Sequence, residues 1–316
     1  GEGDLAVTNF MRAVAAAGYT GPGSLEIFND QFRGGSPETI ARDGHRSIVA
    51  LMDDVRHSEP DTGPGLPQLP RPVTVRDTAF IEFAAQGQEL SKLETLLDTL
   101  GFRRAGRHKS KSVQLWRQGD VRVILNAETE GHAGSAWNAR GTTVCDIGLN
   151  VGSALDTVTR ATALGAKPFT QPLGPGELPI PAIRGLGGSV MHFIDDGDLA
   201  NVWNVEFLSD DKTAPGVGLT RVDHIAQTMT YDEMLSWSLF YTSLFDMVKT
   251  PMVAVIAPDG LVRSRAISTP DGSFRITLNG AETHRTLAGS FLTEGFGGSV
   301  QHIALATDDI FATATA

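Results

Sequence analysis

The sequence has few features that would place the protein in a membrane or outside the cell. Its 316 residues contain a single cysteine, Cys145, which excludes an intramolecular disulfide and is typical of a reducing cytoplasm. No apolar run approaches the roughly 18 residues that a membrane-spanning helix needs. The first residues, GEGDLAVTNF, have neither the basic nor the apolar region of a signal peptide. We therefore expect a cytoplasmic protein with no membrane partner.

Basic charge is also scarce. Lys and Arg total 26 against 37 Asp and Glu, which gives a formal net charge of -11 at pH 7. A nucleic-acid-binding surface needs clustered basic residues, so we expect a small-molecule substrate and no nucleic acid. The composition, 41% hydrophobic and 20% charged, is ordinary for a globular protein of about two domains. The sequence leaves the oligomeric state open, and a homo-oligomer is one of the alternatives.

A proline-rich segment divides the chain. The stretch SEPDTGPGLPQLPRPVT, residues 58–74, holds five prolines, which neither a helix interior nor a central strand tolerates. It predicts an interdomain linker over residues 58–75. We expect one domain before it, at residues 1–57, and two halves of another after it, at 76–210 and 211–316.

The segment before the linker is too small for a core of its own. Its pattern predicts a helix from Leu5 to Ala17, a strand SLEIF at 24–28, and a second helix that begins at Ser36 and Pro37. One strand between two helices cannot close a core. We therefore expect residues 1–57 to be the end of a larger domain, and the absent initiator Met agrees with this.

After the linker, one order of elements recurs: a strand, a helix and further strands. The four units begin with TAFIEFA (78–84), TTVCDIGL (142–149), TRVDHIAQ (220–227) and SVQHIAL (299–305). In the third unit, Thr230 and Glu233 predict a capping box at the start of the helix. The repeat is βαβββ and the fold class is α+β, with an open, barrel-like groove formed by each pair of units.

Two histidines stand in the first strands of the third and fourth units, His224 in VDHIAQ and His302 in VQHIAL. We expect these strands to lie close together, so that the two imidazoles could bind a metal ion; two His and one carboxylate suit non-haem Fe(II). The alternative is that each is a packed core histidine. Alignment of the units puts Glu82 opposite His224 and Asp146 opposite His302, so the fold does not require histidine there, although the first half could be a degenerate copy. The other six histidines are expected to be solvated or packed.

The motifs around these histidines resemble 4-hydroxyphenylpyruvate dioxygenases. VDHIAQ, VRS and FGGSVQHIAL resemble the C-terminal half of that family, and RHKSKSVQLWRQGDVRVILN and PAIRGLGGSVMHFID the N-terminal half, over residues 76–316. The resemblance implies the vicinal oxygen chelate fold, a first half without a metal site, and a second half in which His224 and His302 bind Fe(II). The family's third ligand is a Glu on a strand that would follow Ala316.

The same resemblance implies that Ser264 and Asn279 lie near a substrate. The family usually follows that asparagine with Glu-Pro, whereas Gly280 and Ala281 stand here. Two readings of this half therefore stay open: an Fe(II) oxygenase of the 4-hydroxyphenylpyruvate dioxygenase type, and a non-catalytic regulatory or oligomerisation domain.

The first 57 residues resemble another family. AAAGYTGPGSLEIFNDQFR and ARDGHRSIVALMDDV resemble the last strand and helices of a sugar-phosphate-isomerase-type TIM barrel, in particular bacterial 3-dehydroshikimate dehydratases, some of which carry a dioxygenase-like domain behind the barrel. This implies a metal-dependent lyase of aromatic compound catabolism that makes protocatechuate. Glu26 matches a ligand of Mg, Mn or Co, and strand alternation would point it into the barrel; the alternative is a buried Glu paired with an unseen base. No general base is predicted, and we expect residues 1–316 alone to be nearly inactive.

Overall fold

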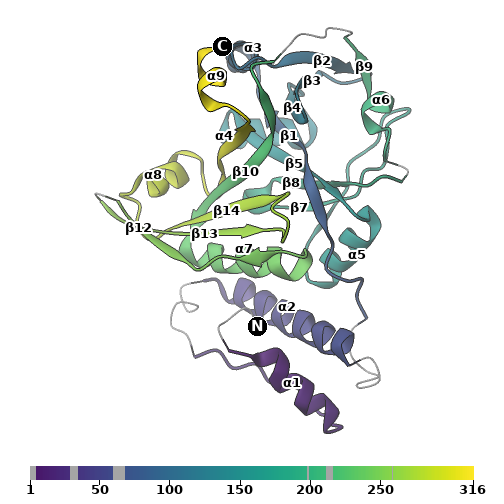
Figure 1. Ribbon diagram of the computed structural model, residues 1–316, viewed down its shortest axis with the longest axis vertical. Coiled ribbons are helices and arrows are strands. Elements are labelled where there is room, and N and C mark those ends of the chain that lie inside the picture. The colour runs from purple at the N-terminus through teal and green to yellow at the C-terminus, as the bar shows by residue number, and fades with distance from the viewer. Residues whose placement is uncertain (1–4, 29–34, 60–67, 198, 211–215, 258) are drawn as a thin grey trace.

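The computed structural model describes residues 5–28, 35–59, 68–197, 199–210, 216–257 and 259–316. It contains two β-sheets with helices around them and a pair of N-terminal helices at one end (Figure 1). Residues 60–67 of the predicted linker lie outside the described residues. Within the described ranges, no helix combines the length and the apolar character needed to cross a membrane.

The first sheet has nine strands in the order β6-β7-β8-β5-β1-β4-β3-β2-β9. Its strands are β1 (Val75–Ala84), β2 (Arg103–His108), β3 (Val113–Gln118), β4 (Val121–Asn126), β5 (Thr143–Val151), β6 (Pro168–Phe169), β7 (Ala182–Arg184), β8 (Val190–Ile194) and β9 (Phe207–Ser209). The helices of this half are α3 (Gly87–Thr99), α4 (Gly131–Arg140), α5 (Ala154–Ala163), the short 3-10 helix η2 (Leu186–Gly188) and α6 (Val202–Glu206).

The second sheet has six strands in the order β11-β13-β14-β10-β15, with β12 paired to β13. Its strands are β10 (Leu219–Thr230), β11 (Val248–Lys249), β12 (Val253–Ala257), β13 (Gly260–Ser268), β14 (Arg275–Ala281) and β15 (Ser299–Thr307). Its helices are α7 (Tyr231–Leu244), α8 (Leu287–Glu294) and α9 (Ile310–Thr315). The predicted capping box of Thr230 and Glu233 starts α7 and is confirmed.

The two sheets repeat one topology. β1 pairs in parallel with β4 and antiparallel with β5, and β10 pairs in parallel with β14 and antiparallel with β15. The predicted α+β fold with tandem βαβββ units is therefore confirmed. Each half also contains a helix that the sequence pattern does not predict, α4 before β5 and α8 before β15.

The helices α4 and α8 each contain a glycine that lets them approach a preceding loop. A Cβ on Gly134 would lie 2.3 Å from the carbonyl oxygen of Thr129, and a Cβ on Gly289 would lie 2.1 Å from that of Thr283. Glycine lowers helix propensity, so these segments read as loops in the sequence. In the structure the same residues are needed because no side chain fits there.

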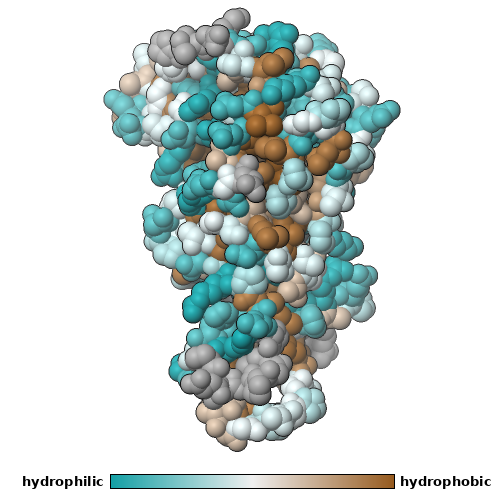
Figure 2. Space-filling model, turned by 90° about the vertical axis from the view of Figure 1, so that its right-hand side faces the viewer, coloured by the Kyte–Doolittle hydropathy of each residue, from teal (hydrophilic) through white to brown (hydrophobic). Residues whose placement is uncertain are grey.

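A continuous apolar core joins the two halves. It contains buried side chains from both sheets and from the helices on them, such as Phe80, Phe193, Ile225 and Phe245. On the face shown in Figure 2, apolar side chains come to the surface in separate patches among hydrophilic ones. The two halves therefore share one apolar core, and burial of such side chains is the main source of stability in a folded protein.

The N-terminal helices α1 (Val7–Ala16) and α2 (Pro37–Ser58) lie outside both sheets, and α2 packs on α7 (Figure 1). Ser36 caps α2 by accepting a hydrogen bond from the Thr39 amide at 3.1 Å, as the sequence predicts. The strand predicted at 24–28 is wrong, because these residues form no strand and Phe28 is 90% exposed. A strand needs a neighbouring strand, and no other lies among the described residues before β1.

Candidate metal site

The register of β10 and β15 brings the two predicted histidines together. His224 lies opposite Ala304, and His302 lies opposite Ala226, so the histidines are diagonal neighbours on one face of the sheet. Their ring centroids are 5.5 Å apart, with the rings close to perpendicular at 81°. The prediction that the two strands adjoin is confirmed, and the side chains are close enough to share one ion.

Asp223 orients the first imidazole. Nδ1 of His224 donates a hydrogen bond to Oδ2 of Asp223 at 2.8 Å, which makes Nε2 the ring nitrogen that can bind a metal ion. A carboxylate on the far nitrogen of a histidine is the common arrangement behind a metal ligand. The hydrogen bond from His224, aided by Arg275, holds the pKa of Asp223 below its ordinary value.

The surroundings of His302 favour the neutral form of its ring. Partial burial, and then the neighbouring His224, lower the pKa of His302. Neither ring nitrogen of His302 has a hydrogen-bond partner within the part of the chain that the structure describes. Two imidazoles that each offer a ring nitrogen suit Fe, Zn, Cu or Ni, so the donor set fits a transition metal. No Asp or Glu among the described residues joins the two histidines in a cluster of three ligands.

Ser264 and Asn279 stand on the same sheet. They are opposite one another on β13 and β14, and the Ser264 hydroxyl donates to Oδ1 of Asn279 at 2.9 Å. Asn279 lies beside Thr228 in the parallel pair of β14 and β10, so alternation along β10 places it on the face that carries His224. The structure thus brings four of the five predicted site residues to one sheet face.

The fifth predicted residue, Glu26, lies apart from the others. It is exposed, in the segment between α1 and α2, and it belongs to no group of potential metal ligands among the residues described. Its predicted role as a ligand of the barrel therefore stays a prediction.

The first half shows which residues stand where the second half has histidines. The pairing of β1 with β5 shifts register between Thr78 and Phe80 and again between Glu82 and Phe83. The pairing of β10 with β15 shifts at the corresponding points, between Val222 and His224 and between Ala226 and Gln227. This register matches Asp146 with His302, as predicted, but it matches Phe80 with His224. The predicted correspondence of Glu82 with His224 is wrong. A shift by two residues keeps every side chain on its face, so the apolar pattern alone does not reveal it.

The first half instead holds an acidic cluster at the base of its groove. Glu82 lies opposite Asp146, and Oδ2 of Asp146 lies 2.5 Å from Nδ1 of His192. Burial and the neighbouring Asp146 raise the pKa of Glu82 to about 7. Burial alone would lower the pKa of His192, but the charge and hydrogen bond of Asp146 outweigh it and raise this pKa.

His192 was not singled out from the sequence, although a signal was present. The motif GGSV-x-H occurs twice, at 187–192 and at 297–302. The two copies stand on strands that pair differently. His192 is on β8, which pairs in parallel with β5, whereas His302 is on β15, which pairs antiparallel with β10.

A third group, His108, Glu177 and Glu206, brings its ligand atoms within 4.8 Å of one another. Nδ1 of His108 accepts hydrogen bonds from the backbone amides of Ser110 and Lys111, each at 3.2 Å. Nε2 must then carry the proton and donate to Glu206 at 2.8 Å. Since neither ring nitrogen keeps a free lone pair, this cluster is a hydrogen-bond network and not a metal site.

Comparisons with known proteins agree with the two-part organisation. Residues 70–208 match the family model described as "Hydroxyphenylpyruvate dioxygenase, HPPD, N-terminal". The 3-dehydroshikimate dehydratase of Pseudomonas aeruginosa is 38% identical over 318 residues, 99% of this chain and 50% of the relative. The chain thus spans about half the length of the dehydratases it matches.

A solved structure covers both parts. It is a "xylose isomerase-like TIM barrel/4-hydroxyphenylpyruvate dioxygenase fusion protein", which matches with a TM-score of 0.84 and 35% identity over 100% of this chain and 51% of its own. The 4-hydroxyphenylpyruvate dioxygenase of Pseudomonas sp. (strain P.J. 874) is 32% identical over 249 residues, 77% of this chain and 69% of the relative. The chain therefore belongs to the 4-hydroxyphenylpyruvate dioxygenase family.

Proposed function

We propose that this chain is the part of a metal-dependent 3-dehydroshikimate dehydratase that joins the end of its TIM barrel to a dioxygenase-like, metal-binding domain. The dehydratases of two Pseudomonas species support this, because their similarity extends over 98–99% of the chain and so includes the first 57 residues. The fusion structure, which covers the whole chain, supports the same order of parts.

Within this proposal, His224 and His302 hold a divalent metal ion, and Fe(II) is the ion that we expect. The observation that carries it is the arrangement of two adjacent imidazoles, one of them oriented by Asp223. A bound Fe(II) would supply a Lewis acid with positions for substrate and oxygen. The protein's own part is to keep Nε2 of His224 unprotonated and to offer the hydroxyl and amide of Ser264 and Asn279 on the same face.

In the dehydratase part, Glu26 would be one ligand of a Mg, Mn or Co ion that polarises the substrate during loss of water. The carboxylate is exposed and lies between α1 and α2, where the remaining barrel would supply its companion ligands. The expected product is protocatechuate. We expect residues 1–316 alone to form it slowly or not at all, and protocatechuate production by this chain at the rate of a whole dehydratase would contradict that.

Titration with Co(II) tests the histidine site. The visible absorption of Co(II) changes when imidazole nitrogens bind it, so the purified chain should bind one equivalent with a new d–d band. His224→Ala and His302→Ala should each lose the band, whereas His284→Ala, which removes an exposed histidine, should keep it. If His224→Ala binds Co(II) as tightly as the parent, the site is wrong. Glu26→Gln shows whether the barrel segment binds part of the Co(II).

A second candidate function is an Fe(II) oxygenase that acts on a 2-oxo acid such as 4-hydroxyphenylpyruvate. The hydrogen-bonded Ser264 and Asn279 on the face of His224 favour it. The measurement is oxygen uptake by the Fe-loaded protein with 4-hydroxyphenylpyruvate, against His224→Ala. Uptake no greater than that of the variant would exclude this activity.

The remaining candidate, a non-catalytic regulatory or oligomerisation domain, has one structural argument. A Cβ on Gly280 would lie 2.8 Å from Sδ of Met234 and 3.1 Å from the Cα of Tyr231. The position after Asn279 is therefore closed by the start of α7, and a larger residue would displace that helix. Metal binding without oxygen uptake is the result that this candidate predicts.

A further inference from the structure

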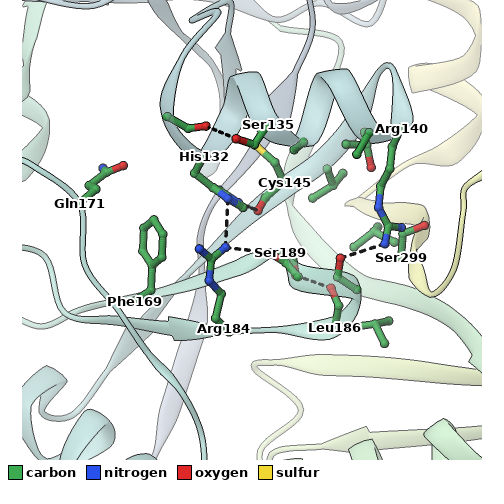
Figure 3. A pocket seen from close by; sticks show the side chains of 18 of the residues that line it. His132, Ser135, Arg140, Cys145, Phe169, Gln171, Arg184, Leu186, Ser189 and Ser299 are labelled. Atoms are coloured by element: carbon green, nitrogen blue, oxygen red, sulfur yellow. Dashed lines mark hydrogen bonds between the residues drawn. The ribbon is translucent and has the colours of Figure 1, made fainter.

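A cavity of about 520 Å³ lies where the two halves meet, and the proposed function does not use it. Its walls come from α4, from residues 169–172, from the segment 184–189 and from the start of β15. Figure 3 shows Arg184 and Arg140 on either side of the turn that carries Leu186 and Ser189, with Ser299 of the second half beside Arg140. The cavity is therefore built by both halves and differs from the groove of His224.

The charge of this cavity is opposite to that of the whole chain. Its lining includes Arg140, Arg184 and His132 together with several hydroxyl groups, and no Asp or Glu is among its described residues. The chain as a whole has 37 acidic and 26 basic residues. A concave surface with two cations and no anion attracts negatively charged molecules.

Arg184 is held in place without a carboxylate. Its guanidinium lies 4.4 Å from the centroid of the Phe169 ring, and its Nη1 donates to the Gly188 carbonyl at 3.0 Å and to Nδ1 of His132 at 3.2 Å. His132 is fixed in turn, because its Nε2 donates to the Cys145 carbonyl at 2.9 Å. These contacts leave Nε and Nη2 of Arg184 available to a ligand.

Arg140 joins two glycine turns from opposite halves. It donates to the Gly187 carbonyl at 2.9 Å and to the Gly298 carbonyl at 3.1 Å. The turns touch one another so closely that a Cβ on Gly187 would lie 1.9 Å from the Gly298 oxygen. Among the residues that the structure describes, neither Arg140 nor Arg184 forms an ion pair with a carboxylate.

We propose that this cavity is a binding site for a small organic carboxylate with an apolar or aromatic body. The guanidinium fork of Arg184 matches a carboxylate in geometry and charge. Phe169, Leu186 and Val300 offer apolar surface to the rest of the ligand. Because Arg140 holds the turn that leads into β15, an occupant would join the two halves next to the strand that carries His302.

The test uses 4-fluorobenzoate as the probe and fluorine NMR of metal-free protein, prepared on a chelating resin so that the histidine site does not contribute. Saturable line broadening is expected. Arg184→Gln and Arg140→Gln should weaken binding by about tenfold or more, since each removes a charged hydrogen-bond donor. Arg107→Gln, an exposed residue outside the cavity, removes the same charge and should leave binding unchanged.

Two comparisons make the result decisive. Benzoate should displace the probe and inorganic phosphate should not, which separates a carboxylate site with an apolar body from a general anion site. The neutral 4-fluorobenzamide should not bind. The proposal is overturned if the probe shows no saturable binding or if the amide binds as well as the probe. It is likewise overturned if Arg107→Gln weakens binding as much as the cavity variants do, or if phosphate displaces the probe and benzoate does not. Circular dichroism shows whether Arg140→Gln is folded; if it is not, Arg184→Gln, which changes an exposed side chain, decides.

Discussion

Asp53 in α2 and Arg160 in α5 form a buried ion pair, with Nη1 of Arg160 2.6 Å from Oδ2 of Asp53 and side chains that are 0% and 1% exposed. Arg160 also donates to the carbonyls of Ser243 and Pro70, at 2.8 and 2.7 Å. One guanidinium thus connects α2, α5, the end of α7 and the segment before β1. This pair attaches the N-terminal helices to the dioxygenase-like part of the chain.

Asp53→Asn should lower the free energy of unfolding by about 3–5 kcal/mol. The substitution keeps the shape of the side chain but leaves the guanidinium of Arg160 buried without its counter-charge. Urea unfolding followed by circular dichroism measures the loss. Glu38→Gln on the same helix breaks an exposed ion pair with Arg42 and should change stability by no more than about 0.5 kcal/mol. Equal effects of the two changes would show that burial does not matter here.

The repeat and the two histidines could be predicted because local patterns carry them. Strand–helix alternation fixes the order of the units, and His224 and His302 stand at comparable points of two such units. The identity of Phe80 as the counterpart of His224 could not be predicted, since it depends on irregularities in strand pairing that involve residues far apart in the chain. Arg160 was missed for a similar reason: its partners come from α2 and α7.

The strand predicted at 24–28 is the opposite case, in which a local pattern predicts an element that the structure does not contain. Its alternating apolar residues favour a strand, but a strand is stabilised by its neighbours, and the described residues around it supply none. Local preference alone does not form a strand. The role predicted for Glu26 depends on such neighbouring strands and stays a prediction.

Asp223→Asn should weaken metal binding at His224 and His302 by about 10–100-fold, if the proposed site is right. The amide can donate to Nδ1 of His224 as well as accept from it, so Nε2 is no longer kept free of its proton. Competition titration with Co(II) measures the affinity. Asp308→Asn makes the same change in charge at an exposed position after β15 and should leave the affinity unchanged. A comparable loss in both variants would point to net charge alone.

Gly148→Ala should destabilise the first half by about 1–3 kcal/mol, the cost of overpacking. Its Cβ would lie 2.2 Å from Cδ1 of Phe80, so the ring must move, and Trp203, whose ring meets Phe80 edge-on at 5.8 Å, should change its fluorescence. Thermal unfolding and tryptophan emission check both effects. Gly152→Ala is the matched control because nothing lies within 4 Å of its Cβ, and its stability should stay within about 0.5 kcal/mol of the parent.

Glu82→Gln should make the protein more stable at alkaline pH. The raised pKa of Glu82, about 7, means that the folded state keeps a proton that the unfolded chain releases near pH 4.5. The folded state therefore loses stability as the pH rises from about 4.5 to 7, and the loss stays constant above that range. Glutamine has no proton to release and can still accept from Asn126, whose Nδ2 lies 2.9 Å from Oε1.

We expect Glu82→Gln to exceed the parent by about 1–3 kcal/mol in free energy of unfolding at pH 8, and to differ by no more than about 0.5 kcal/mol at pH 4.5. Urea unfolding at a series of pH values gives both numbers. Glu89→Gln on α3 is the control: it removes a half-exposed carboxylate that pairs with Lys92 at 2.7 Å, and it should gain no stability at pH 8. A Glu82→Gln variant that is less stable than the parent at pH 8 would mean that the carboxylate is ionised and stabilising, and that His192 balances the charges of both Glu82 and Asp146.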